Sequence, residues 1–558
     1  MRVKATALIL IFFFYASVAI AQVDEAREAI DRGEYVRAVN ILAALVAERP
    51  TPDAYLYLGI AYRRTKENEK AAEVLKEGSE RYPQDPRFHN ELAGLNLENN
   101  DIEGAKTQLR QALRSDPANS YASDMLATID MSAGDVQSAL RSWNKTGRPV
   151  IDDILHNYYL SFGSWVVREA VAFHPAGVLR YEEWKTTESR LFATGDFANV
   201  GLEVEPTTVP DHYDAVVRTT TKKNSFGNFA VDILKGLPFQ SVFPDLWNIG
   251  NSGVNFNGYY RWQRDRRRVN GSLKIPLPLP GILNLQLGDT WRSESWNTSP
   301  TILPQFLQQA RFDYKSNGIG MQLNYIPHYR VEIGGGLLYR NRAASGQFPQ
   351  LFDSLNTGTF TLNTSLRLVD RRYQNRLYLE SFAASHSILG NIGFNGGVAE
   401  LNNRFTLSKD TRTYFDWTLK GGSSRGNLPI DNYFVLGLDT INPPNPLRGH
   451  SAAAHGQYGN GPMGTDFVLV NLDLDRRLAT LPLFNTLNIP YLTVKWEVFL
   501  DSAKTWDRNH IFQQGKLWID TGAGLRFETP THSFNIVYGR SLRDGTGVFT
   551  AYVERRLW

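Results

Sequence analysis

The chain has no cysteine among its 558 residues, which excludes disulfide bonds and thiol chemistry. Its formal net charge is only +3, so the total charge provides no strong attraction to nucleic acid or anionic lipid. Long apolar runs are scarce as well. After the N-terminal segment no run of about 18 apolar residues occurs, which excludes a bundle of membrane-spanning helices. The length is nevertheless enough for several domains.

Motifs of catalysis and cofactor binding are also missing. No H-E-x-x-H, G-x-S-x-G, Walker or G-x-G-x-x-G pattern occurs in a fitting context. His450 and His455 share one loop, but no nucleophile pattern lies near them. The sequence therefore predicts no enzyme, no cofactor and no metal site.

The N-terminus has the three parts of a secretory signal peptide. The basic residues Arg2 and Lys4 precede an apolar segment at residues 5–15, and Ala19-Ile20-Ala21 forms an A-x-A site before Gln22. The apolar segment is short for a membrane anchor, which is the alternative. We expect residues 1–21 to be removed during secretion.

Small residues and prolines recur through residues 22–146 at a nearly constant interval. Spacings of 33 or 34 residues appear in three independent sets: Ala38, Ala71, Ala105 and Ala139; Pro50, Pro83 and Pro117; and Gly59, Ala93 and Ala127. The pattern resembles tetratricopeptide repeats, in which small residues let paired helices approach closely. Such a stack offers a concave surface to peptides or partner proteins, and a plain spacer is the alternative.

Residues 147–223 predict a linker helix and one small α+β domain. The expected elements are a helix around Ile151 and Ile154, a strand ending near Phe173, a helix around 182–193, and strands at 200–204 and 213–218. The segment at residues 190–200 resembles the polypeptide-transport-associated (POTRA) module. By that resemblance Gly195 is the turn after the helix, and Phe197 and Val200 are core positions. The module's known mode is strand addition at an exposed sheet edge; an unrelated α+β domain is the alternative.

From residue 224 to the end, short segments alternate in polarity and are separated by Gly, Asn, Asp and Pro. Period two with aromatics near the segment ends is typical of a transmembrane β-barrel. The 335 residues that remain (558 minus 223) suffice for sixteen antiparallel strands at roughly 10 residues each plus turns. A water-soluble sandwich would show the same period, but inward charges on many strands and the signal peptide favour a barrel in the outer membrane.

One long loop carries Leu447-Arg448-Gly449-His450, and strands with inward-facing acids follow it. If Val468 and its neighbours at the same parity face lipid, Asp473 and Asp475 face the lumen. The same count turns Asp501 and Asp520 inward, beside Gly522 and Gly524, whose missing side chains would leave room for a loop. Arginine suits such a partner because its planar fork binds a carboxylate through two bonds. A lumen lined with solvated charge is the alternative.

This order of segments resembles the BamA-like outer-membrane protein-translocating superfamily, also known as bacterial surface antigen barrels. There an Arg-Gly-aromatic motif on the sixth loop enters the lumen and meets acids on the following strands. Arg448 and Gly449 match this motif, whereas His450 stands in place of Tyr or Phe. By resemblance Asp473 and Asp501 match the partner acids, and Asp475 is a competing candidate at the same parity.

The end of the chain resembles the closing strand of the same superfamily. Its outward row includes Phe549, Ala551, Val553 and Leu557, and Trp558 falls one residue out of step with the usual terminal aromatic. In the family the first and last strands meet in a weak seam, where unpaired edges recruit a strand.

The resemblance implies an outer-membrane barrel that inserts or translocates polypeptides, with an N-terminal arm in the periplasm. Outer-membrane lipid and an unfolded client polypeptide are the implied partners, the repeats offer a surface for periplasmic proteins, and nucleic acid is not a partner. The alternatives on the same scaffold are a passive porin or surface receptor and a secretion helper for surface lipoproteins.

Overall fold

The structure is a computed structural model that describes residues 21–156, 161–222, 224, 236–237, 240–298, 311–346, 355–369, 373–385, 389–408, 411–438, 446–451, 457–458, 461–482, 491–510, 515–528 and 532–555. Nearly all of the predicted signal peptide and the closing residues Leu557 and Trp558 lie outside these ranges. The chain forms two compact units. One holds the described residues up to Leu155 with Phe173–Tyr181 and Leu202–Val216; the other holds the remainder.

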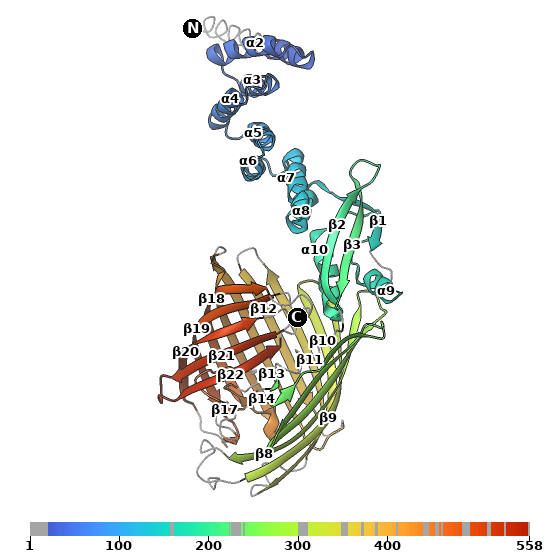
Figure 1. The fold of residues 1–558 in the computed structure, drawn as a ribbon, viewed down its shortest axis with the longest axis vertical. Coiled ribbons are helices and arrows are strands. Elements are labelled where there is room, and N and C mark those ends of the chain that lie inside the picture. Colours follow the sequence, from blue (N-terminus) through green and yellow to red (C-terminus); the bar gives the residue numbers. More distant parts are fainter. Residues whose placement is uncertain are drawn as a thin grey trace, which may run out of the picture. The chain divides into compact units, whose positions relative to one another are not determined.

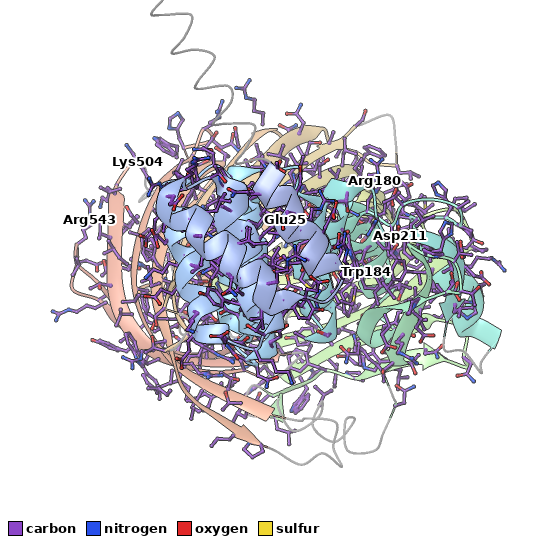
Figure 2. The ribbon with its side chains drawn as sticks, turned by 90° about the horizontal axis from the view of Figure 1, so that it is seen from above. Glu25, Arg180, Trp184, Asp211, Lys504 and Arg543 are labelled. Carbon is purple, nitrogen blue, oxygen red and sulfur yellow. The ribbon has the colours of Figure 1, made fainter. Side chains whose placement is uncertain are left out.

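The first unit begins with paired helices, as the repeat pattern predicts. After a helical segment at residues 21–31 they are α2 (Tyr35–Glu48), α3 (Pro52–Arg64), α4 (Asn68–Arg81), α5 (Arg87–Glu98), α6 (Ile102–Ser115), α7 (Ser120–Ser132) and α8 (Val136–Trp143). Several begin at a polar cap; the side chains of Thr51, Asp101, Asn119 and Asp135 each accept a backbone N–H of the first turn. Figure 2 labels Glu25 at the start of this region, where it pairs with Arg37 at 2.8 Å.

The repeated small residues lie where the helices touch. Ala38, Ala71, Ala105 and Ala139 are all completely buried. A Cβ atom added at Gly59 would collide with the side chain of Leu75. The close approach of paired helices is therefore confirmed, and it depends on the absence of larger side chains at these points.

A small mixed sheet follows the repeats. Its elements are β1 (Val150–His156), α9 (Ser161–Ala170), α10 (Tyr181–Thr194), β2 (Phe197–Pro206) and β3 (His212–Thr221), with the strand order β1-β3-β2.

Two expectations for this region are wrong. The segment with Ile151 is strand β1 rather than a linker helix, and the segment before Phe173 contains helix α9 rather than a strand. Ile151 donates its N–H to Gly177 O at 2.9 Å and is completely buried. These tertiary contacts stabilise the extended conformation of the segment. In α9 the buried residues Val166, Val167 and Ala170 fall on one helical face. Short apolar segments are ambiguous between helix and strand, and tertiary pairing decides them.

The remaining strands close into an antiparallel barrel (Figure 1). In the described residues sixteen strands form it: β4 (Ser241–Val242), β5 (Asp245–Ile249), β6 (Val254–Gln263), β7 (Arg266–Leu277), β8 (Leu283–Thr298), β9 (Arg311–His328), β10 (Val331–Gly346), β11 (Leu355–Val369), β12 (Tyr373–Ala384), β13 (Phe394–Ser408), β14 (Thr413–Gly426), β18 (Asp466–Pro482), β19 (Tyr491–Trp506), β20 (Leu517–Glu528), β21 (His532–Ser541) and β22 (Gly547–Arg555). The short β16 (Gln457–Tyr458) adds a parallel pairing to β8. The predicted fold class is confirmed.

Side chains alternate across the barrel wall. On β19, Val498 and Leu500 are about two-fifths exposed on the outer face, whereas Glu497 and Asp501 are 1% and 0% exposed. Apolar residues outside and polar residues inside are the arrangement of a barrel in lipid. Near the strand ends Lys504 lies over the Trp506 ring at 5.1 Å and Arg543 over the Trp518 ring at 5.4 Å; Figure 2 labels both cations. Separately, no helix in the described ranges is both long enough and apolar enough to cross a membrane.

Candidate functional site

The loop between β14 and β18 folds back against the inner face of the barrel. Its described parts include the short helix η5 (Ile430–Asn432) and the paired strands β15 (Phe434–Val435) and β17 (Met463–Gly464). Leu447 is completely buried in an apolar cluster with Leu436, Phe467, Leu469 and Ala503. Because Phe467, Leu469 and Ala503 are on β18 and β19, this cluster seats the loop on the wall that carries the acids.

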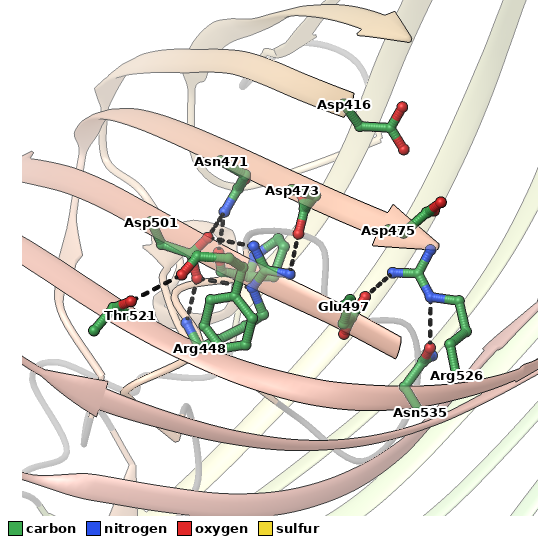
Figure 3. Close-up of polar contacts among 12 residues, drawn as sticks. Asp416, Arg448, Asn471, Asp473, Asp475, Glu497, Asp501, Thr521, Arg526 and Asn535 are labelled. Atoms are coloured by element: carbon green, nitrogen blue, oxygen red, sulfur yellow. Dashed lines mark hydrogen bonds and ion pairs between the residues drawn. The ribbon is translucent and has the colours of Figure 1, made fainter. Parts of the chain in front are cut away.

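Arg448 lies beside two acids on neighbouring strands. Its Nη2 donates to Asp501 Oδ1 at 2.6 Å and its Nε to Asp501 Oδ2 at 2.9 Å, a fork on one carboxylate. Its Nη1 donates to Asp473 Oδ1 at 2.5 Å, and its backbone N–H also donates to Asp501. Arg448 is 4% exposed and Asp501 0% exposed, so the pair is shielded from bulk water. Figure 3 shows the guanidinium enclosed by Asp473, Asp501 and Asn471.

Two further side chains complete the surroundings of Arg448. Asn471 donates to Asp501 Oδ1 at 2.7 Å and to the Pro446 carbonyl at 2.8 Å, so it holds both the acid and the loop backbone. The Phe499 ring centroid lies 3.7 Å from the Arg448 guanidinium carbon, within cation–π range. The parity that turns Asp501 inward also applies to Phe499 two residues earlier, so this partner was within reach of sequence reasoning.

The next two motif residues bind a third acid, Asp520 on β20. Gly449 N donates to Asp520 Oδ2 at 2.7 Å, and His450 Nδ1 lies 2.9 Å from the same oxygen. A Cβ atom added at Gly449 would lie 2.6 Å from Asp520 Cγ, so only glycine fits. The His450 ring meets Trp518 edge-on, with 4.7 Å between the ring centroids, so this position of the motif makes an aromatic contact.

The competing acid, Asp475, lies apart from Arg448. Its nearest cations are Arg404 at 3.6 Å and Lys495 at 3.8 Å. Figure 3 shows Asp475 farther along the strand that carries Asp473. The structure therefore brings Asp473 and Asp501, but not Asp475, to the loop arginine.

The expected role of Gly522 and Gly524 is wrong in detail. A Cβ atom at Gly522 would lie 2.5 Å from the Phe499 ring, and one at Gly524 would lie 3.1 Å from Glu497 Oε1, so neighbouring strands occupy the space. The glycine that admits the loop is Gly539 on β21, where an added Cβ atom would collide with the Arg448 carbonyl.

The other predicted site residues fall elsewhere. Gly195 ends α10 with a left-handed φ of +87°, and Phe197 is 2% exposed. Val200 is only half-buried. On β22, Phe549 is 73% exposed on the outer face, and Ala551, at the same parity, is half-buried. The side chain of Val553 is not described, and Leu557 and Trp558 lie outside the described residues.

A buried charge also lies in the turn between α10 and β2. Burial raises the pKa of the Asp196 carboxyl to about 7, and Lys222 and Lys274 are the cations that face it. Burial likewise lowers the pKa of Lys222, which stands 3.9 Å over the Trp247 ring, to about 8. No sequence pattern singled out this pair.

Sequence reasoning also missed a second contact of the same loop. Asp431 in η5 accepts from Arg340 Nη1 at 2.9 Å and from Arg342 Nε at 2.7 Å, and both arginines are on β10. Two arginines at the same parity on one strand were the available signal.

Comparison with known proteins concerns the repeats and the barrel separately. Residues 23–86 match the family model of the tetratricopeptide repeat. CdiB from Escherichia coli is similar over 73% of this chain and 76% of that chain, with a TM-score of 0.51 at 12% identity. The part of the chain that this match covers has the CdiB fold. Other similar structures are BamA from Haemophilus ducreyi lacking POTRA domains 1-3 (TM-score 0.44, 11% identity, 73% and 85% covered) and CdiB from Acinetobacter baumannii (0.48, 10%, 82% and 86%). No curated protein matches.

The site consists of ion pairs between the loop and the barrel wall. Arg448 donates hydrogen bonds to both Asp501 and Asp473, so a single guanidinium ties the loop to two strands. In the described ranges no group of three or more His, Asp or Glu residues could hold a metal ion. The arrangement fixes the position of a loop.

Proposed function

We propose that this chain is an outer-membrane barrel that inserts or translocates polypeptides. The observation that carries the proposal is the β14–β18 loop, held against the inner wall by the buried Arg448 contacts with Asp501 and Asp473. The fold shared with CdiB agrees with it. No step of this function requires a catalytic residue or a cofactor.

The chemistry of the loop contact suits a gate. A buried ion pair brings little net stability, because both charges lose their hydration when they pair. Such a contact specifies one position of the loop, and it can exchange for water or for a charged segment when the lumen opens. Opening an apolar contact of the same size would expose apolar surface to water, and no new polar partner would offset that loss of free energy.

The N-terminal arm would lie in the periplasm and capture clients or partner proteins. Tetratricopeptide repeats present a surface for peptides. In the small sheet the order β1-β3-β2 leaves β1 and β2 as edges within the described residues, and an edge accepts an extended client strand.

The seam of the barrel provides the exit. Within the described part of the chain, the nine-residue β22 has the two-residue β4 as its neighbour across the closure. A junction between strands of nine and two residues is where we expect the barrel wall to open most easily. A nascent strand could pair there before it leaves into lipid.

Site-specific photo-crosslinking tests the proposal. A photoreactive residue at Phe549, which faces outward on the seam strand, or at Tyr121 on the repeats, should capture unfolded polypeptides in living cells. The matched control is Leu379 on β12, an outward-facing residue away from the seam, which should capture none. Mass spectrometry identifies the captured chains.

A different outcome would support the porin alternative. If neither position captures a polypeptide and the purified barrel conducts small solutes with saturation, the chain is a passive pore. The proposed function would then be wrong, even if Arg448 holds the β14–β18 loop against the inner wall.

A further inference from the structure

Four strands of the barrel bring arginines together in one row. Arg268 on β7 is the cross-strand partner of Arg292 on β8, Arg292 pairs with Ser316 on β9, and Ser316 pairs with Arg342 on β10. Neighbouring strands lie about 4.8 Å apart, so the row covers roughly 14 Å of the inner wall. Arg340 stands two residues from Arg342 at the same parity.

This row departs from the usual rule for sheets. Like charges directly opposite each other, such as Arg268 and Arg292, destabilise a pair of strands. Glu294 relieves part of the repulsion, because Arg268 Nη2 donates to it at 2.8 Å. Positions where a local rule is broken and only partly compensated are often functional.

The row has more positive than negative charge. Among the residues that the structure describes, its four arginines, Arg268, Arg292, Arg340 and Arg342, face two carboxylates, Glu294 and Asp431, so four minus two leaves an excess of two positive charges. One of the two acids, Asp431, belongs to the loop and not to the wall. When the loop leaves, the excess rises to three.

Several donors in the row have no partner. In the described part of the chain, Arg292 Nε, Arg340 Nε and the Tyr314 hydroxyl are buried without a hydrogen bond. Tyr314 is only 5% exposed. Buried donors without acceptors are costly, and here they stand beside uncompensated positive charge, so an anion would satisfy both.

Asp431 shows which anion fits. Its two oxygens accept from Arg340 and Arg342, and Arg342 Nη2 also donates to Asn432 Oδ1 at 2.9 Å. The Asp431 side chain is 7% exposed. The site therefore already binds a carboxylate on a peptide, with one charge-assisted hydrogen bond from each of two arginines.

We propose that this arginine row is a binding site for the carboxylates of acidic polypeptide segments inside the lumen, with Asp431 as its resident ligand. The assignment rests on the proposed function, because it names a chemical class of client.

The test measures peptide binding to the purified full chain by fluorescence anisotropy. The probe is a fluorescein-labelled heptaglutamate peptide, with heptalysine as the charge control. Asp431→Asn should tighten heptaglutamate binding about tenfold, because the tethered competitor is gone. Arg292→Gln should weaken it about tenfold. Arg376→Gln, a lumen arginine on β12 outside the row, is the matched control and should bind as the unchanged protein does.

Each other outcome overturns the inference. Equal binding by the Asp431→Asn variant and the unchanged protein would show that Asp431 does not occupy a peptide site. Equal effects of Arg292→Gln and Arg376→Gln would show that only general lumen charge matters. Full competition by inorganic phosphate at the same concentration would reassign the site to phosphate groups. Heat-modifiable gel migration shows that each variant is folded, and the tightening in Asp431→Asn cannot arise from misfolding.

The two proposals fail separately. If heptaglutamate binds as expected but no polypeptide is captured in cells, the translocation function falls and the anion site stands. If polypeptides are captured but binding ignores Asp431 and Arg292, the anion site falls alone.

Discussion

Replacing Arg448 by alanine should release the β14–β18 loop from the inner wall. The change removes three side-chain hydrogen bonds, two to Asp501 and one to Asp473. It leaves Asp501 completely buried, with Asn471 and the backbone N–H of residue 448 as donors. The stranded carboxylate is the main source of the expected loss.

The size of the effect follows from that burial. Breaking a buried ion pair by removing one partner costs about 3–5 kcal/mol. The donors that Asp501 retains place the loss near the lower end, about 3 kcal/mol. At 1.4 kcal/mol for each factor of ten, the ratio of docked to undocked loop should fall roughly 100-fold.

Because the chain has no cysteine, a single introduced thiol reports on the loop. Ser451→Cys, directly after the motif, should react with a maleimide up to about 100 times faster in the Arg448→Ala background, since this half-buried site becomes more exposed when the loop undocks. The matched control is Arg508→Ala. Arg508 pairs with Asp466 at 2.7 Å but is 48% exposed, so its loss should change the rate less than about fivefold.

Two further variants sharpen the test. Arg448→Lys should restore only part of the protection, because an ammonium cannot form the fork on Asp501. Arg448→Asp with Asp501→Arg should protect better than either single change, although Asn471 would then face a guanidinium. An unchanged labelling rate in Arg448→Ala would refute the reasoning, and the motif would be an ordinary turn.

Three other predictions concern different parts of the chain. Gly539→Ala should raise labelling of the same thiol because its Cβ atom would displace the Arg448 carbonyl, whereas Gly421→Ala, with its nearest atom at 3.4 Å, should not. Asp196 has its folded pKa raised to about 7 from about 3.9 when unfolded, so its contribution to stability is full at low pH and is lost as pH rises through 7. The unfolding midpoint should therefore fall between about pH 4 and 7, and Asp196→Asn should flatten that slope; an equal slope in both proteins would exclude Asp196 as its source. Deleting Val23–Trp143 should leave heat-modifiable migration of the barrel intact, because repeats are stabilised by their own neighbours; loss of the folded band would contradict this.

Sequence reasoning failed in this protein where contacts between distant segments decide. Asp473 and Asp475 share a strand and a parity, but they are about 6.8 Å apart along the strand. Only the position of the loop decides that Arg448 reaches Asp473. Gly539 meets Arg448 because strands β19 to β21 lie in register beside the motif. Asp431 pairs with arginines 89 and 91 residues away, a separation that no local pattern encodes.

The sequence by itself determined the features that recur at a regular interval along the chain. The interval of 33 or 34 residues specified the helical repeats, and the period of two specified the barrel strands and turned Asp473 and Asp501 inward, because local backbone geometry dictates which way a side chain points. The tertiary structure alone decided that Ile151 is in a strand and that Asp475 is distant from Arg448. It also decided that the β14–β18 loop places Arg448 against β18 and β19 and Asp431 against β10. These depend on the register between strands and the seating of a long loop, where burial and pairing outweigh local preference.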